Sequence, residues 1–128
     1  MKLLLDTHLL IWTAADMLPG AAAEYIFDKS NELFFSSLSI WEIVIKRKFE
    51  RNDFKIDPYL LHSKLLDNGY NEMRINSGHA LLIVTLPLLH KDPFDRMLLA
   101  QSIAEGIPLL TADRILAQYP APVIYVKR

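Results

Sequence analysis

The sequence predicts a single α/β domain with a largely parallel central sheet, and three observations support this prediction. Short apolar runs of the kind found in strands buried on both faces alternate with segments whose apolar residues recur at helical spacing. The length of 128 residues suits one compact domain. No internal repeat, low-complexity stretch or linker divides the chain. We therefore expect residues 1–128 to form one α/β sandwich.

The apolar runs predict the strands of this sheet. The first run, Leu3 to Leu5, starts almost at the first residue, and the third is the weakest because it is the most polar. The expected strands cover residues 3–5, 33–35, 72–75, 109–110 and 123–126.

Helical spacing and end signals predict the helices. Asp92 and Pro93 form the clearest start, with Asp92 as the N-cap and Pro93 at the first helical position. Gly69 and Gly106 are typical residues at helix ends, and residues 52–53 interrupt the helical pattern. The expected helices cover residues 7–15, 21–29, 38–48, 58–68, 77–86, 93–106 and 113–118.

Composition excludes several classes of protein. The chain has no cysteine, which rules out disulfides, thiolate catalysis and cysteine-ligated zinc, and which fits a reducing cytoplasm. The apolar N-terminus is interrupted by Asp6 and His8, lacks the features of a signal peptide and is too short to cross a bilayer. We therefore expect a cytoplasmic protein without a membrane partner. The net charge of -1 means that any contact with nucleic acid must come from local basic patches.

Four acidic residues stand where predicted strands lead into predicted helices. Asp6 follows the first strand, Glu42 lies early in the helix after the second, Asp95 lies in the first turn of the helix that Asp92 caps, and Asp113 follows the fourth strand. In an open parallel sheet the carboxyl ends of the strands lie along one edge, where ligands bind. We expect at least three of these acids to point into one region.

Each acid also has a purely structural interpretation. Asp6 can cap a helix, residues 39–42 have the S-x-x-E form of a capping box, Asp95 stands three residues after Asp92, and Asp113 can serve a helix dipole. Capping explains the four together less well, because crowded carboxylates stay ionised only beside a compensating cation. Hard divalent ions with oxygen ligands, such as Mg²⁺, supply that charge, whereas no histidine-rich cluster indicates zinc. Asp92 itself is expected to be a cap and not a ligand.

The segments LLLDTHLLIW, SSLSIWEIVIK and DPFDRMLLAQSIAEGIPLLTAD, with the closing apolar strand, together resemble the PIN domain. They look most like the VapC-type toxins of bacterial toxin–antitoxin modules. The resemblance covers essentially the whole chain, and DPFDRMLLAQ is its most specific part. It implies a Rossmann-like, three-layer α/β/α fold with a mostly parallel sheet. It also implies one or two Mg²⁺ or Mn²⁺ ions, single-stranded RNA as substrate, a small antitoxin partner and a homodimer.

The resemblance transfers the family's acidic quartet to Asp6, Glu42, Asp95 and Asp113, and it places Thr111 beside the last acid. The resulting hypothesis is an endoribonuclease that hydrolyses RNA with metal-activated water. Asp6 and Asp95 are the expected main metal ligands, and Asp113 completes the set or holds an ordered water. Glu42 would hold waters around the metal, and Thr111 would orient Asp113 or a water.

Basic residues supply weaker candidates for RNA binding. Lys46 and Arg47, in a run that continues with Lys48 and Arg51, could contact phosphates or simply form a solvated helix end. Arg96 and Arg114 are further candidates, and for Arg96 an ion pair with a neighbouring acid is the alternative. The sequence alone favours neither use of Arg96.

Three other side chains, His8, Trp12 and Trp41, also have a functional and a structural interpretation. His8 is expected to make a polar contact to backbone and not to carry a proton, since metal-activated water needs no histidine. Trp12 and Trp41 lie at helical spacing, which favours core packing over the stacking of RNA bases. An antitoxin could dock in an apolar groove near these two tryptophans and present a basic side chain to the acids.

Two alternatives to a nuclease remain from the residues. The first is a non-catalytic α/β binding module in which the acids are only caps. The second is a phosphotransfer domain of the receiver or dehalogenase type, which also places an aspartate after its first strand. The dehalogenase pattern has a second aspartate where His8 stands, and the receiver pattern needs paired acids and a late lysine that are not clear here.

Overall fold

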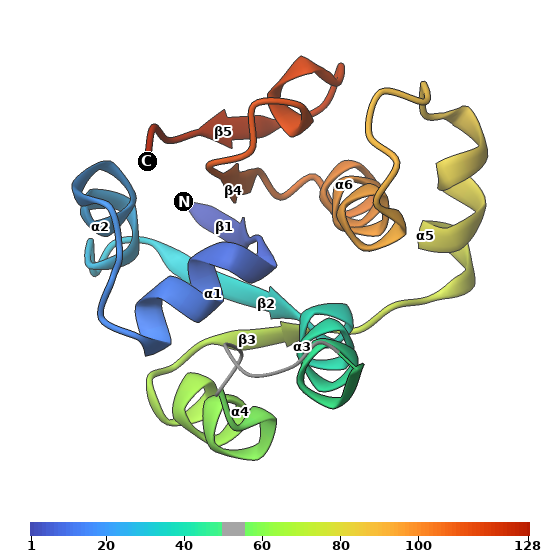
Figure 1. Ribbon diagram of the computed structural model, residues 1–128. Coiled ribbons are helices and arrows are strands. Elements are labelled where there is room, and N and C mark those ends of the chain that lie inside the picture. Colours follow the sequence, from blue (N-terminus) through green and yellow to red (C-terminus); the bar gives the residue numbers. More distant parts are fainter. Residues whose placement is uncertain (50–55) are drawn as a thin grey trace.

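The computed structural model describes residues 1–49 and 56–128, and its centre is a parallel sheet. The strands are β1 (Lys2–Leu5), β2 (Glu32–Ser36), β3 (Asn71–Met73), β4 (Leu109–Thr111) and β5 (Val123–Tyr125). They form a 5-stranded sheet in the order β3-β2-β1-β4-β5, and every neighbouring pair is parallel (Figure 1). The predicted parallel sheet is therefore confirmed.

The helices lie close to the predicted segments. They are α1 (Thr7–Ala14), α2 (Gly20–Ile26), α3 (Ser37–Phe49), α4 (Pro58–Asp67), α5 (Ser77–Leu82) and α6 (Pro93–Glu105). As predicted, Asp92 caps α6 by accepting a hydrogen bond from the Phe94 amide at 2.8 Å. Gly106 ends that helix in the left-handed region, with φ of 67°, which suits a residue without Cβ.

Two predicted helices are replaced, in part or completely, by 3₁₀ turns. The segment after α5 tightens into a 3₁₀ turn, η1 (Ile83–Thr85), so that the α-helix ends at Leu82. The predicted helix 113–118 is only the 3₁₀ turn η2 (Leu116–Gln118), which follows a turn in which Oδ1 of Asp113 accepts from the Ile115 amide. The predicted break at residues 52–53 lies outside the described residues.

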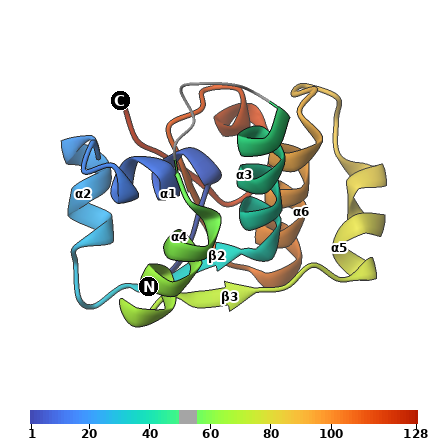
Figure 2. The same ribbon diagram turned by 60° about the horizontal axis from the view of Figure 1, so that its bottom comes forward.

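Helices cover both faces of the sheet. Successive strand residues point to opposite faces, so Leu3 and Leu5 belong to one apolar core and Leu4 to the other. The first core includes residues of α1, α2 and α4, and the second is built on Leu98 and Leu99 of α6. α5 packs against α6, and Figure 2 shows α3 beside α6. The result is the three-layer α/β/α arrangement that was expected.

One prediction about the core was wrong. Trp41 is 57% exposed, because α3 turns Leu38, Glu42 and Ile43 inward. Its ring makes an edge contact with Phe94 at 5.3 Å between centroids. Trp12, by contrast, is partly buried and packs against the first core.

The strand order positions the site. From β1 the chain moves outward through β2 to β3, whereas β4 returns to the other side of β1 and leads outward to β5. The carboxyl ends of β1 and β4 therefore flank the point where the order reverses, which is where open α/β sheets bind ligands. Asp6 directly follows β1 and Asp113 lies two residues after β4. None of the helices described in residues 1–49 and 56–128 combines the length and apolar character needed to cross a membrane.

Candidate active site

Asp6 directly follows β1 and is buried at the point where the strand order reverses. Its Oδ1 accepts a hydrogen bond from the Leu9 amide at 2.9 Å, which caps α1. Its Oδ2 accepts a hydrogen bond from the hydroxyl of Thr111, the last residue of β4. Asp6 therefore caps a helix and also reaches the neighbouring strand, so the two interpretations of this residue are compatible.

Asp113 divides its oxygens in the same way. Its Oδ1 accepts from the Ile115 amide at 2.8 Å, and its Oδ2 lies 2.9 Å from Nε2 of His90. The Asp113 amide donates to the Thr111 hydroxyl at 3.0 Å. Thr111 thus links Asp6 to the Asp113 backbone, which is consistent with the orienting role expected from the sequence.

Glu42 is only 2% exposed and projects from the second turn of α3. Its Oε1 accepts from the Thr7 hydroxyl at 2.7 Å, and its Oε2 pairs with Lys46 at 2.9 Å. The capping box expected over residues 39–42 does not form, because α3 begins at Ser37, directly after β2. The Ser39 hydroxyl instead lies 2.8 Å from Thr7 Oγ1.

Asp95 has the least compensated carboxylate of the four. It is buried in the first turn of α6, and within the described residues its only hydrogen-bonding or ionic partner is His90, at 3.2 Å. Burial, together with the charges of Asp92, Glu42 and Asp6, raises the pKa of Asp95 to about 7 against the opposing effect of His90. Asp95 therefore lies within electrostatic reach of both Glu42 and Asp6.

The pKa of Asp6 is raised as well. Burial is the main cause, and the nearby charge of Asp113 adds to it. The hydrogen bonds from Thr111 and from the Leu9 amide act in the opposite direction. A site that resists the ionisation of two buried carboxylates favours a compensating cation, and its oxygen-rich donors fit a hard divalent ion.

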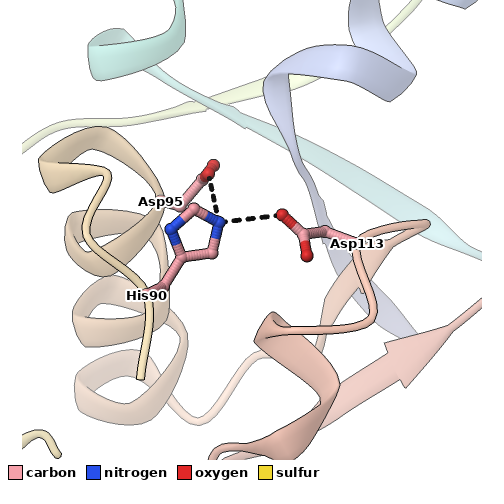
Figure 3. Close-up of side chains that lie close together, drawn as sticks. All are labelled: His90, Asp95 and Asp113. Atoms are coloured by element: carbon pink, nitrogen blue, oxygen red, sulfur yellow. Dashed lines mark hydrogen bonds and ion pairs between the residues drawn. The ribbon is translucent and has the colours of Figure 1, made fainter. Parts of the chain in front are cut away.

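His90 is the site residue that sequence reasoning missed. It lies in the segment before α6, and its Nε2 is close to carboxylate oxygens of both Asp95 and Asp113 (Figure 3). One potential ligand atom from each of these three residues lies within 4.8 Å of the others. The only signal in the sequence is that His90 stands two residues before the Asp92-Pro93 pair, and a loop without periodicity does not reveal where its side chains point.

The basic candidates have different surroundings. Lys46 is paired with Glu42, and Arg47 lies 3.6 Å from Asp57, so both contact acids. Nε of Arg114 donates to the Tyr125 hydroxyl at 3.3 Å. Arg96 forms no ion pair with an acid among the described residues, contrary to one of its two interpretations. Lys48 is exposed, and Arg51 lies outside the described part of the chain.

A small cavity of about 240 Å³ opens beside the acids. It is lined by Asp6, His8, Trp12, Ala112, Asp113 and Arg128. The expected contact of His8 with backbone is absent from the described residues, and its ring instead lies 5.9 Å from that of Trp12. The guanidinium of Arg128 lies 4.6 Å from the centre of the Trp12 ring on which it stacks.

The fold and the site together define a class of protein. It is a parallel α/β domain with an acidic cluster at the carboxyl edge of its sheet, suited to a hard divalent cation. The PIN domain family model matches residues 3–122, and the chain belongs to this family.

Individual relatives agree with this assignment. The chain is 31% identical over 124 residues to ribonuclease VapC22 of Mycobacterium tuberculosis. This match covers 94% of this chain and 95% of that protein. Its fold is similar to a chain in the crystal structure of VapBC2 from Rickettsia felis bound to a promoter DNA fragment, with a TM-score of 0.70, 17% identity and 98% of both chains covered. DNA-bound VapBC from Salmonella typhimurium gives a TM-score of 0.68 at 15% identity, again over 98% of both chains.

Proposed function

We propose that this protein is a metal-dependent endoribonuclease and the toxin of a toxin–antitoxin module. The observation that carries the proposal is the meeting of Asp6, Glu42, Asp95 and Asp113 from four separate elements, with raised pKa values for Asp6 and Asp95. The similarity to ribonuclease VapC22 supports the same activity. RNA is the proposed substrate, and we expect the protein to act in the cytoplasm.

Asp6, Asp95 and Asp113 are the proposed ligands of one or two Mg²⁺ or Mn²⁺ ions. When bound, such an ion lowers the pKa of a coordinated water and neutralises charge that develops on the phosphoryl oxygens. Thr111 fixes Asp6 and the Asp113 backbone, which holds the two carboxylates in place beside each other. Asp95 contributes the charge that the protein itself compensates least, so the ion gains most from this ligand.

Glu42 has a supporting role in this proposal. The Thr7 hydroxyl and Lys46 each hold one of its oxygens, which fixes the carboxylate and lowers its tendency to bind an ion directly. Glu42 can still hold an ordered water at the edge of the site. The proposed phosphate contacts remain Lys46, Arg47, Arg96 and Arg114. Lys46 and Arg47 are already paired with acids, so RNA would have to compete with those acids for them.

The proposed partner is a small antitoxin protein. A cavity of about 420 Å³ with a mostly apolar lining, which includes Ile40, Val44, Pro58 and Tyr59, lies between α3 and α4 and offers one place for an apolar segment. The Trp12 cavity lies beside the acids, where a basic side chain of the partner could reach them. We also propose a homodimer, and the exposed apolar residues Leu81, Val84 and Leu88 on and after α5 are the surface that supports it.

Asp95→Asn tests the proposed function most directly. The change keeps the size of the side chain and removes its charge. We expect cleavage of cellular RNA in the presence of Mn²⁺ to fall at least about 100-fold, and growth inhibition to be lost. The circular dichroism spectrum should be unchanged.

The matched control is Asp67→Asn, an equal change of charge at an exposed residue at the end of α4. It should cleave RNA at the wild-type rate. Full activity in Asp95→Asn would contradict the proposed site. If Mn²⁺ and Mg²⁺ raise neither the melting temperature nor any nuclease activity of the wild type, the non-catalytic binding module is the better interpretation.

A further inference from the structure

The ring of His90 has polar neighbours at both nitrogens. Its Nε2 lies 3.2 Å from Oδ2 of Asp95 and 2.9 Å from Oδ2 of Asp113. Its Nδ1 lies 3.1 Å from the backbone nitrogen of Asp92. A neutral imidazole carries one N–H donor and one lone pair, so these neighbours decide which nitrogen holds the proton.

The contact at Nδ1 selects the tautomer. The Asp92 amide can only donate, so Nδ1 must present its lone pair and the proton must be on Nε2. Oδ2 of Asp113 accepts a hydrogen bond from that Nε2–H, and Oδ2 of Asp95 lies within ion-pair distance of the same nitrogen (Figure 3). A metal ion at Nε2 would need the lone pair there. The proton would then move to Nδ1 and face the Asp92 N–H, leaving two donors opposed.

The backbone around the ring is fixed by independent contacts. The Tyr119 hydroxyl is buried and accepts hydrogen bonds from the amides of Leu89 at 3.2 Å and His90 at 2.8 Å. Asp92 is fixed in turn, because it caps α6. The amide that points at Nδ1 is therefore part of a rigid helix start, and ring rotation or tautomer exchange would break an ordered set of hydrogen bonds.

From this geometry we propose that His90 is a positioning residue whose Nε2–H donates to Asp113 and holds that carboxylate beside Asp95, and that His90 is not a metal ligand. The proposal rests on the proposed function in so far as those carboxylates bind the catalytic ion. It predicts a coordination shell made of oxygen alone. Such a shell favours Mg²⁺ and Mn²⁺ over ions that prefer imidazole, such as Zn²⁺ and Ni²⁺.

The first test reads the tautomer directly in the metal-free protein. Long-range ¹H–¹⁵N correlation spectra of ¹⁵N-histidine-labelled protein distinguish the two tautomers, and His90 is assigned by its absence from the His90→Gln variant. We expect the Nε2–H form. His79 serves as a reference in the same spectrum, since its Nδ1 also accepts from a backbone amide, that of Asn76, at 3.2 Å. An Nδ1–H form at His90 would overturn the proposal.

The second test examines the bound ion. Pulsed electron paramagnetic resonance on the Mn²⁺-loaded wild-type protein detects a directly bonded imidazole nitrogen through its hyperfine coupling. We expect no such coupling, and a coupling that disappears in His90→Gln would show that His90 is a ligand and overturn the proposal. Neither spectroscopic test depends on RNA cleavage. An inactive protein would therefore count against the proposed function alone.

Two variants separate the roles by function. His90→Gln places an amide N–H near the position of Nε2, whereas His90→Leu removes the donor. We expect His90→Leu to weaken Mn²⁺ binding and RNA cleavage by about tenfold to 100-fold, and His90→Gln to recover most of both. Equal loss of Mn²⁺ affinity in the two variants, with unchanged melting temperatures, would mean that the imidazole itself is needed and would contradict the proposal.

Discussion

His79 and His90 have similar hydrogen bonds in very different surroundings. In each ring Nδ1 accepts from a backbone amide, which leaves Nε2 to meet carboxylate oxygen. His79 meets one acid, Glu105, whose side chain is 44% exposed, and it completes a capping box at the start of α5. His90 meets two acids that are less exposed, Asp95 at 10% and Asp113 at 29%. The hydrogen bonds of the two rings are therefore alike and do not show which histidine belongs to a site. The number and burial of the surrounding carboxylates do show it.

The largest expected effect concerns pH and the acidic cluster around His90. The pKa of Asp95 is raised from 3.8 to about 7 in the folded protein, so folding binds a proton and stability falls as pH rises between these values. At about 1.4 kcal/mol per pKa unit, full ionisation of Asp95 lowers the free energy of unfolding by on the order of 4 kcal/mol. Urea unfolding in EDTA at pH 5 and pH 8 measures roughly 3 kcal/mol of this loss, because Asp95 is already largely ionised in the unfolded state at pH 5.

Two comparisons isolate the cause of this pH dependence. Asp95→Asn should be more stable than the wild type at pH 8 and should flatten the dependence, and Mn²⁺ should restore stability to the wild type at that pH. Glu105→Gln, beside His79, should leave the slope unchanged, because its carboxylate is half-exposed. Equal stability of the wild type at both pH values would refute the electrostatic conflict at Asp95.

We expect a smaller effect at His79, where substitutions should lower the free energy of unfolding and leave RNA cleavage unchanged. His79→Ala removes a buried ring and the hydrogen bond to the Asn76 amide, which should lower the free energy of unfolding by about 2 kcal/mol. His79→Gln should recover most of this loss, because glutamine is one of the usual residues at the N3 position of a capping box. RNA cleavage by both variants should remain close to wild type. A large loss of cleavage in folded His79→Gln would mean that the two histidines do not differ as described.

The smallest expected change in stability is at Thr111. Thr111→Val keeps the shape of the side chain but removes the hydroxyl shared by Asp6 and the Asp113 amide. We expect about 1 kcal/mol of destabilisation and about tenfold weaker Mn²⁺ binding by calorimetric titration. Thr13→Val, which removes a hydroxyl bonded to the Leu9 carbonyl within α1, should cost some stability and leave Mn²⁺ affinity unchanged. Unaltered Mn²⁺ binding in Thr111→Val would show that the hydroxyl does not support the acids.

The sequence predicted most of the elements because their signals are local. Runs such as Leu3 to Leu5 identify buried strands, and the Asp92-Pro93 pair marks the start of α6. The order of the strands has no such signal, since it depends on how helices pack across the sheet. The same limit applies to Trp41, because helical spacing shows which residues share a face but not which face is covered.

The candidate site was predicted in part for similar reasons. The four acids stand at strand and helix ends that the sequence reveals, and the structure brings them together. The capping box at residues 39–42 was wrong because no residue separates β2 from α3, which moves Glu42 into the second turn. His90 was missed because its direction is set by Tyr119 and by the Asp92 amide, and Tyr119 lies 29 residues away in the chain.

The position of Arg128 has a practical consequence for measuring metal binding. Its side chain stacks on Trp12 and shares a cavity with Asp6 and Asp113. An oligohistidine affinity tag joined after Arg128 would emerge next to these acids, where its imidazoles could capture the titrated ion or shield the cavity from substrate. The amino group of Met1, which precedes β1, contacts Asn31, which precedes β2. A tag attached before Met1 would therefore leave the molecule from the other end of these strands. Purification from that end keeps the acidic cavity clear.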